Sequence, residues 1–126
     1  MKIIVAGSRT YKNHQVVYAV LDVVVQKGDV VLQGGAPGVD RIAKTWARTH
    51  GIACQEFTAD WDAFGTAAGR LRNVMMAKIG DALIAFSDGE SPGTNSMIQC
   101  MQRAGKPIQY VYHDAKHPEA AMFIPF

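Results

Sequence analysis

Short apolar runs alternate along the chain with longer amphipathic segments. The short runs predict five strands, over 2–6, 29–33, 52–57, 81–86 and 107–112. The longer segments repeat apolar residues every three or four positions and predict helices, over 14–27, 39–50, 70–79 and 95–104. Strands that alternate with helices build a parallel sheet through right-handed crossovers. We therefore expect a three-layer α/β domain of the Rossmann-like type, in which a five-stranded parallel sheet is flanked by helices.

Two of the predicted helices have a clear apolar stripe. In 39–50 the stripe includes Trp46, which we expect in the core. In 70–79 the stripe is also expected to face inward, and it consists of Leu71, Val74, Met75 and Ile79. Arg72 and Asn73 fall off that stripe, so they are placed to reach either a ligand or a partner subunit.

Composition narrows the class of protein. The chain has 126 residues, of which 48% are hydrophobic, enough for one packed domain over 1–126 with an irregular C-terminal tail over 113–126. No apolar run approaches the roughly 20 residues of a membrane span, and the N-terminal run is too short for a secretion signal, so we expect a cytoplasmic protein without a membrane partner. Cys54 and Cys100 lack metal-ligand spacing, and we expect neither a metal nor a cofactor. The net charge of +2 is too mild to indicate nucleic acid.

Glycine-rich loops follow three of the predicted strands. The carboxyl ends of parallel strands share one edge of a sheet, so these loops are expected to meet there. Bare backbone N–H groups at the start of a helix bind anions. We expect the loops to hold the phosphate of a nucleotide-like small molecule, through Gly7, Ser8, Arg9, Gly34, Gly35, Ala36, Gly38, Ser87, Ser91, Gly93, Thr94 and Asn95.

Each of these features also has a purely structural interpretation. The glycines after the second strand are equally suited to a tight strand-to-helix turn, and Thr94 or Asn95 to capping the next helix. Asp40, in the first turn of its helix, is either a capping residue or the partner of a sugar hydroxyl. Trp61 either stacks on a base or closes the core beside a long loop.

Two features favour a homodimer or a higher homo-oligomer. The segment 14–27 is rich in valine, which suggests burial on more than one side. The chain also ends in an apolar run, 122–126, which is suited to cover a hydrophobic face of this domain or of a neighbour.

Four stretches together resemble the SLOG superfamily, and in particular its small YspA/YpsA-like branch, whose members are often phage-borne. They are GSR at 7–9, GGAPGVDRIAKTWA at 34–47, ADWDAFGTAAGRLRNVMM at 59–76 and DALIAFSDGESPGT at 81–94. The resemblance implies a Rossmann-like binder of nucleotides or nucleotide derivatives that often dimerises. The superfamily includes the LOG phosphoribohydrolases, which release a base from its ribose monophosphate, and the DNA-binding protein DprA.

The resemblance to the LOG enzymes is incomplete. Their pattern of an Arg followed four residues later by Met is matched by Arg72 and Met76, and their Gly-Thr pair by Gly93-Thr94. They carry an acid three residues after that Thr, and here Met97 stands in its place. Cleavage of a glycosidic bond needs a carboxylate, so this activity is not implied by the motif alone.

Three functions remain as competing expectations. The first is a module that senses or sequesters a nucleotide, with Trp61 and Asn73 added to the loop residues. The second is an N-glycosyl hydrolase that acts on a nucleoside monophosphate, with Arg72 and one of three carboxylates as catalytic residues: Asp40, Asp88 or Glu90. The third is a single-stranded DNA binder of the DprA kind, which the low charge and the single candidate stacking Trp disfavour.

Overall fold

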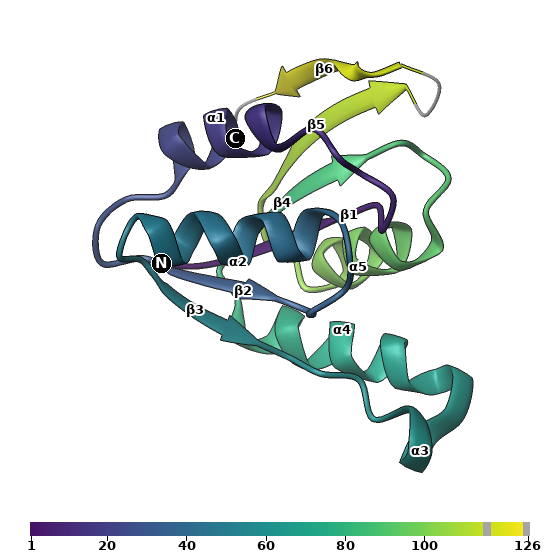
Figure 1. Cartoon of the computed structure of the whole chain (residues 1–126). Helices are drawn as coiled ribbons and strands as arrows, with labels where there is room; N and C mark the ends of the chain where they lie inside the picture. The colour runs from purple at the N-terminus through teal and green to yellow at the C-terminus, as the bar shows by residue number, and fades with distance from the viewer. Residues whose placement is uncertain (115–116, 125–126) are drawn as a thin grey trace.

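The computed structural model describes residues 1–114 and 117–124, and within them six strands form one sheet in the order β3-β2-β1-β4-β5-β6 (Figure 1). The strands are β1 (Lys2–Gly7), β2 (Val30–Gln33), β3 (Ala53–Glu56), β4 (Ala82–Ser87), β5 (Ile108–Asp114) and β6 (His117–Ile124). The helices are α1 (His14–Val24), α2 (Val39–Thr49), α3 (Trp61–Phe64), α4 (Ala68–Ile79) and α5 (Pro92–Arg103), with a 3₁₀ turn η1 (Gly65–Ala67) before α4. Strands β1 to β5 are all parallel, which confirms the prediction of a Rossmann-like, five-stranded parallel sheet.

Helices cover both faces of this sheet. Ile3 of β1 packs with α1 and α2 on one face, whereas Ile4 packs with α4 and α5 on the other. Successive strand residues point to opposite faces, so this alternation is what a doubly covered sheet requires. Trp46 is buried against the first face, as expected, and its Nε1 atom donates to Asp22 Oδ1 at 2.8 Å.

The C-terminal tail is not irregular, and that prediction is wrong. His117–Ile124 forms β6, which pairs antiparallel with β5 and places Tyr110 opposite Ile124. Without β6, the edge of β5 would present an open row of backbone N–H and C=O groups. The connection over 115–116 contains no Gly or Asn that would have signalled a hairpin. Residues 125–126, the end of the apolar run, lie outside the described residues.

Helix α5 begins three residues earlier than predicted. Ser91 is its N-cap residue and Pro92 is its first helical residue. Proline suits that position because its fixed φ is helical and the N–H it lacks would have no partner there. Thr94 and Asn95 therefore lie inside the helix, and the expectation that one of them caps it is wrong.

Helix α4 turns its other face to the core. The apolar stripe expected to face inward is 37 to 56% exposed: Leu71, Val74, Met75 and Ile79. The buried positions are instead Ala68, Asn73, Met76 and Ala77. The end of α4 passes so close to the sheet that a Cβ atom on Gly80 would lie 2.5 Å from Ile4 Cδ1. On this inward face Met76 and Ala77 pack with Ile4 of the sheet, and Asn73 bonds to Ser96 of α5.

The connection from β3 to α4 contains a short helix that was not predicted. Asp60 is the N-cap residue of α3, and its Oδ1 atom accepts the N–H of Ala63 at 3.0 Å. In Figure 1, α3 lies beyond the N-terminal end of α4, away from the sheet. None of the helices described is long and apolar enough to cross a membrane.

Candidate functional site

A cavity of about 370 Å³ opens where the loops after β1, β2 and β4 meet α4 and α5. Its volume falls within the range of roughly 300–1,000 Å³ that is typical of small-molecule sites. The structure thus brings together the three loops that the sequence placed at one sheet edge. The candidate residues that line the cavity are Gly7, Ser8, Arg9, Gly34, Ala36, Asp40, Arg72, Asn73, Asp88, Glu90, Ser91, Gly93 and Thr94.

Other candidates lie outside the lining, namely Gly35, Gly38, Trp61, Ser87 and Asn95. Two of them shape the loop between β4 and α5. Ser87 Oγ accepts the N–H of Gly89 at 3.2 Å, and Asn95 Nδ2 donates to the Gly89 carbonyl at 3.3 Å. Their contribution to the cavity is therefore indirect.

The cavity also has an apolar floor that was not singled out as a ligand contact. Met76 and Met97 are 3% and 1% exposed, and both line it. Each lies one helical turn beyond a candidate residue, Met76 after Arg72 and Met97 after Gly93. Helical spacing from those candidates would have identified both methionines.

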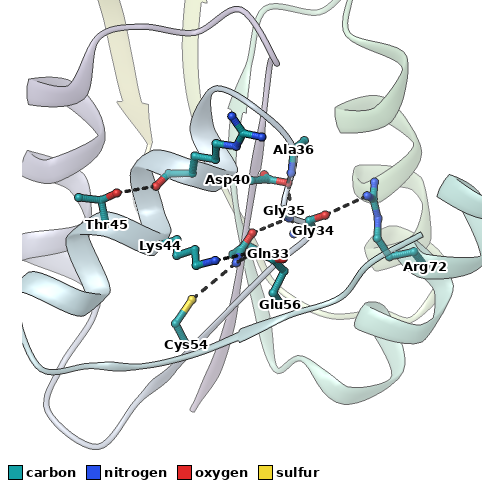
Figure 2. A network of polar contacts seen from close by, with 11 residues as sticks. Gln33, Gly34, Gly35, Ala36, Asp40, Lys44, Thr45, Cys54, Glu56 and Arg72 are labelled. Atoms are coloured by element: carbon teal, nitrogen blue, oxygen red, sulfur yellow. Dashed lines mark hydrogen bonds and ion pairs between the residues drawn. The ribbon is translucent and has the colours of Figure 1, made fainter. Parts of the chain in front are cut away.

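The β2–α2 loop uses its backbone N–H groups internally. Asp40 Oδ2 accepts the N–H of Gly34 and the N–H of Ala36, each at 3.2 Å. The N–H of Gly35 donates to the side-chain oxygen of Gln33. Figure 2 shows Asp40 and Gln33 on either side of this loop. These three N–H groups, which were expected to hold an anion, are thus already bonded within the chain.

The absence of a side chain at Gly38 lets the loop after β1 pass close to it. Its φ is +82°, and a Cβ atom there would collide with the carbonyl oxygen of Ser8 and lie 2.8 Å from that of Arg9. The N–H of Val39, the next residue, donates to the same Ser8 carbonyl at 3.4 Å. Glycine is therefore needed at 38 because the loop after β1 passes directly against it.

Gln33 connects the loop to the edge strand β3. Its Nε2 atom donates to Glu56 Oε1 at 3.1 Å and lies 3.8 Å from Cys54 Sγ (Figure 2). Lys44 Nζ approaches the same Glu56 oxygen at 3.2 Å. The hydrogen bond from Gln33, followed by that from Lys44, lowers the pKa of Glu56. The network keeps the Glu56 carboxylate charged next to Gly35, and it ties the β2–α2 loop to strand β3.

N–H groups at the start of α5 have no hydrogen-bond acceptor among the described residues. The N–H groups of Gly93 and Thr94 lie in its first turn, where no intrahelical acceptor exists and the helix dipole is positive. Asp88 fixes the preceding turn by accepting the N–H groups of Glu90 and Ser91, both at 2.9 Å. Gly93 and Thr94 both line the cavity, and the turn that precedes them is held by Asp88.

Arg72 supplies a positive charge to the same cavity. Its Nη1 atom donates to the Gly34 carbonyl at 3.2 Å. Its Nε atom is buried and has no hydrogen-bond partner among the described residues. The neighbouring Asn73 donates to the Gly93 carbonyl at 3.4 Å and to Ser96 Oγ at 3.2 Å, which ties α4 to the first turns of α5. The guanidinium thus has hydrogen-bonding capacity left beside the free amides.

Asp40 is a buried carboxyl group in the wall of the cavity. It is 7% exposed, and burial raises its pKa to about 6. The Ala36 N–H, the charge of Arg72 and the Gly34 N–H oppose that rise. The Oδ2 atom of Asp40 holds the β2–α2 loop through its two hydrogen bonds, and the Oδ1 atom makes no hydrogen bond to any described residue. Asp40 does not cap α2, because the N-cap residue is Gly38 and no side chain bonds there, so the expectation of a capping residue is wrong. Its carboxyl group lines the cavity instead.

The other two carboxylates differ from Asp40. Asp88 is engaged in its own turn, where it also accepts from Ser91 Oγ at 3.2 Å. Glu90 is exposed at the rim. Among the three candidates for acid–base chemistry, only Asp40 combines burial, a raised pKa and a place in the cavity wall.

Trp61 borders a second hollow of about 520 Å³. The side chain is 57% exposed, so it does not close the core. Asn73, Pro92 and Gly93 line both hollows, which makes them neighbours across the start of α5. Within the described residues there is no cluster of side chains suited to hold a metal ion.

Known proteins resemble the chain in sequence and in fold. A model of the family described as "YspA, cpYpsA-related SLOG family" matches residues 1–64. The Gene 61 protein of Mycobacterium phage D29 is 36% identical over 116 residues, which is 85% of this chain and 93% of the phage protein.

Two solved structures share the architecture. DNA processing protein A (DprA) of Streptococcus pneumoniae superposes with a TM-score of 0.74 at 17% identity, over 86% of this chain and 49% of that protein, so the chain spans about half its length. DprA of Helicobacter pylori, described for its single-stranded DNA binding mode, gives 0.74 at 19% identity over 93% of this chain and 67% of that protein. Their likeness is one of fold, and the sequence matches are decisive: the chain belongs to the YspA, cpYpsA-related SLOG family.

Proposed function

We propose that the protein binds a nucleotide, or a small molecule derived from one, with a phosphate at the N-terminus of α5. The observation that carries this proposal is the convergence of the free Gly93 and Thr94 N–H groups with the Arg72 guanidinium on one cavity. Hydrogen bonds to a charged group contribute roughly 1.5–3 kcal/mol each, so two or three of them hold a phosphate firmly. The β2–α2 loop shapes the wall of the cavity. Its N–H groups do not bind the phosphate, because they already donate to Asp40 and Gln33.

The remainder of the cavity suits the other parts of such a ligand. Met76 and Met97 offer an apolar floor, and Arg9 and Thr10 are exposed polar residues of the lining. A base directed past Gly93 reaches the hollow that Trp61 borders. Stacking of a base on an aromatic face contributes about 1–3 kcal/mol. A single pocket of this kind fits a protein that senses or sequesters its ligand.

Thermal unfolding with a panel of compounds tests this proposal. The panel contains inorganic phosphate, nucleosides and their 5′-monophosphates. We expect the monophosphates to raise the unfolding temperature and the nucleosides to have little effect. A ligand present at about 100 times its dissociation constant adds about 2.7 kcal/mol to the free energy of unfolding. Absence of stabilisation by every phosphate compound contradicts the proposal.

A charged variant at Gly93 locates the site. Nothing lies within 4 Å of a Cβ atom built on Gly93, and an acid in the first turn favours a helix, so Gly93→Asp folds. The added charge repels a phosphate at this helix end and is expected to abolish stabilisation by the monophosphates. Gln15→Asp is the matched control, because it places the same charge at the second helical position of α1, and it should bind as the wild type does.

The properties of Asp40 favour a second candidate function, hydrolysis of the bond between base and ribose. With its pKa near 6, Asp40 holds a proton at mildly acidic pH. In such a reaction Asp40 would protonate the leaving base while water adds to the sugar carbon and releases a proton. Arg72 would hold the phosphate of the substrate during that step. Catalytic acids are commonly tuned in this way by burial.

Chromatography of nucleoside monophosphates incubated with the protein tests this second function. Release of free base that is lost in Asp40→Asn, while binding persists, identifies a hydrolase. Binding without release leaves the binding module alone. Stabilisation by single-stranded DNA that weakens steeply with salt, with none from mononucleotides, would instead favour a nucleic-acid binder.

A further inference from the structure

The outer side of α4 is an apolar surface with no covering element among the described residues. We call it the α4 outer face, and it consists of Leu71, Val74, Met75 and Ile79. These residues recur at helical spacing and are 37 to 56% exposed. Apolar stripes of this kind on a helix are normally buried against another element. The α4 outer face therefore calls for a partner.

A groove continues this surface toward α5. It has a volume of about 300 Å³, and its apolar walls are formed by Val74 and Ala77 of α4 with Cys100 and Ala104 beside them. Val74 belongs both to the groove and to the α4 outer face. The groove lies toward the C-terminal end of α4, and it is large enough to receive a side chain.

The opposite end of α4 carries a projecting apolar side chain. Phe64 of α3 is 55% exposed, and α3 lies beyond the N-terminal end of α4 (Figure 1). One end of the helix thus offers an apolar projection, and the other end offers an apolar groove. Features that match each other at opposite ends of one surface are what a two-fold symmetric contact requires.

The charges at the two ends are complementary as well. The groove is bordered by three cationic side chains, Lys78, Arg103 and Lys106. Asp60 and Asp62, both exposed, flank Trp61 at the start of α3. Arg70, which is also exposed, lies in the first turn of α4. The acidic end of one molecule therefore suits the basic end of another.

We propose that two copies of this chain associate through the α4 outer face, with their α4 helices antiparallel about a two-fold axis. Leu71, Val74, Met75 and Ile79 then pack on their counterparts. Phe64 of each copy reaches the groove of the other, and Asp62 of each copy lies near the other copy's Lys78. Since Arg72 and Asn73 project from the inner side of the same helix, this pairing also restrains the residues that border the cavity.

The mass of the protein in solution tests the association. Sedimentation equilibrium over a concentration series is expected to give about twice the 13.7 kDa of one chain. Met75→Asp places a charge in the centre of the contact and should weaken association by about tenfold or more. Val23→Asp is the matched control, because Val23 is 72% exposed on α1 and lies outside the α4 outer face. Both positions are exposed already, so both variants keep the circular dichroism spectrum of the wild type.

Reversal of one charge pair tests the antiparallel arrangement. Asp62→Lys and Lys78→Asp should each weaken association, and the double variant should recover it, because the pair is rebuilt in the opposite sense. A wild-type protein that stays monomeric at every concentration overturns the proposal. So does a dimer that is unaffected by Met75→Asp, since its contact then lies elsewhere. If the single reversals weaken association and the double does not recover it, the antiparallel register is wrong.

A crosslink covers the case in which Met75→Asp fails to fold. Met75→Cys in a Cys54→Ser background, which removes the exposed native thiol, should form a disulfide between two copies under mild oxidation. Val23→Cys in the same background should not. Equal crosslinking of the two variants counts against the proposed contact.

Discussion

Asp40 Oδ2 accepts the backbone N–H of Gly34 at 3.2 Å, and the same oxygen accepts the N–H of Ala36 at the same distance. A single buried carboxylate thus bonds with two N–H groups of the loop that ends β2. The acid that braces the loop also lines the cavity, where burial raises its pKa to about 6. Loop geometry and cavity charge are therefore linked through one side chain.

The first prediction concerns the pH dependence of stability. The ordinary pKa of an aspartate is 3.8, and that of Asp40 is about 6 in the folded protein. Between these values the folded state holds a proton that the unfolded chain has released. The free energy of unfolding therefore falls as pH rises through this window, by up to about 3 kcal/mol from this group.

Asp40→Asn isolates that contribution. The amide oxygen still accepts the two loop N–H groups, but the side chain cannot ionise. The free energy of unfolding of the wild type, minus that of Asp40→Asn, should decrease from pH 4 to pH 7 and then stay constant. Urea titrations at several pH values measure it, and a difference that is flat over this range contradicts the assigned pKa.

The second prediction compares two glycines with positive φ. Gly38→Ala should cost roughly 3 kcal/mol or more, because the new Cβ atom meets the carbonyl of Ser8 in addition to the backbone strain. Gly51 has a φ of +67° but open space around it, so Gly51→Ala should cost only about 1 kcal/mol. Urea unfolding of both variants measures the difference. Equal costs would show that backbone strain alone explains Gly38.

The third prediction compares two buried glutamines. Gln33 is fully buried and accepts the N–H of Gly35, so Gln33→Leu leaves that N–H without its acceptor and should cost about 1–3 kcal/mol. Gln109 is 1% exposed, and its Oε1 atom has no partner among the described residues. Gln109→Leu should therefore be neutral or stabilising. Thermal unfolding distinguishes the two variants. A larger loss of stability in Gln109→Leu than in Gln33→Leu would contradict the finding that Gln109 Oε1 lacks a hydrogen-bond partner among the described residues.

The strands were predictable because their signal is local. A run such as 82–86 is apolar throughout, which is typical of a strand buried on both faces. Right-handed crossovers between successive strands then imply a parallel sheet, although they do not specify the order of its strands. The parallel sheet therefore depends little on any detail of side-chain packing.

The orientation of α4 was not predictable in the same way. Its apolar stripe, including Leu71 and Met75, favoured one face, but the other face packs on the sheet and carries Asn73, which bonds to α5. Hydrophobic periodicity reports which face is apolar and says nothing of how near the neighbouring element lies. The discrepancy itself points to a partner for the exposed stripe.

The role of Asp40 was also hidden from sequence reasoning. Its position in the first turn of α2 indicated a cap or a contact to a sugar, whereas its side chain turns back onto the loop before the helix. Whether an amide is free or bonded depends on the path of a loop, and spacing along the chain does not specify that path. The residues of the cavity could be named from the sequence, but the free donors among them could not.

The last prediction joins the charge of Asp40 to binding of the phosphate. Below pH 6 the carboxyl group is neutral, and above it a negative charge stands in the cavity beside Arg72. That charge opposes a phosphate, so the affinity of the wild type relative to that of Asp40→Asn should decline as pH rises from 5 to 7.5. Asp40→Asn should bind more tightly than the wild type at pH 7.5 and nearly equally at pH 5. Ionisation of the phosphate itself affects both proteins alike, so the ratio of their dissociation constants reports Asp40 alone. Calorimetric titration at the two pH values gives that ratio, and a ratio independent of pH would place the phosphate beyond the influence of Asp40.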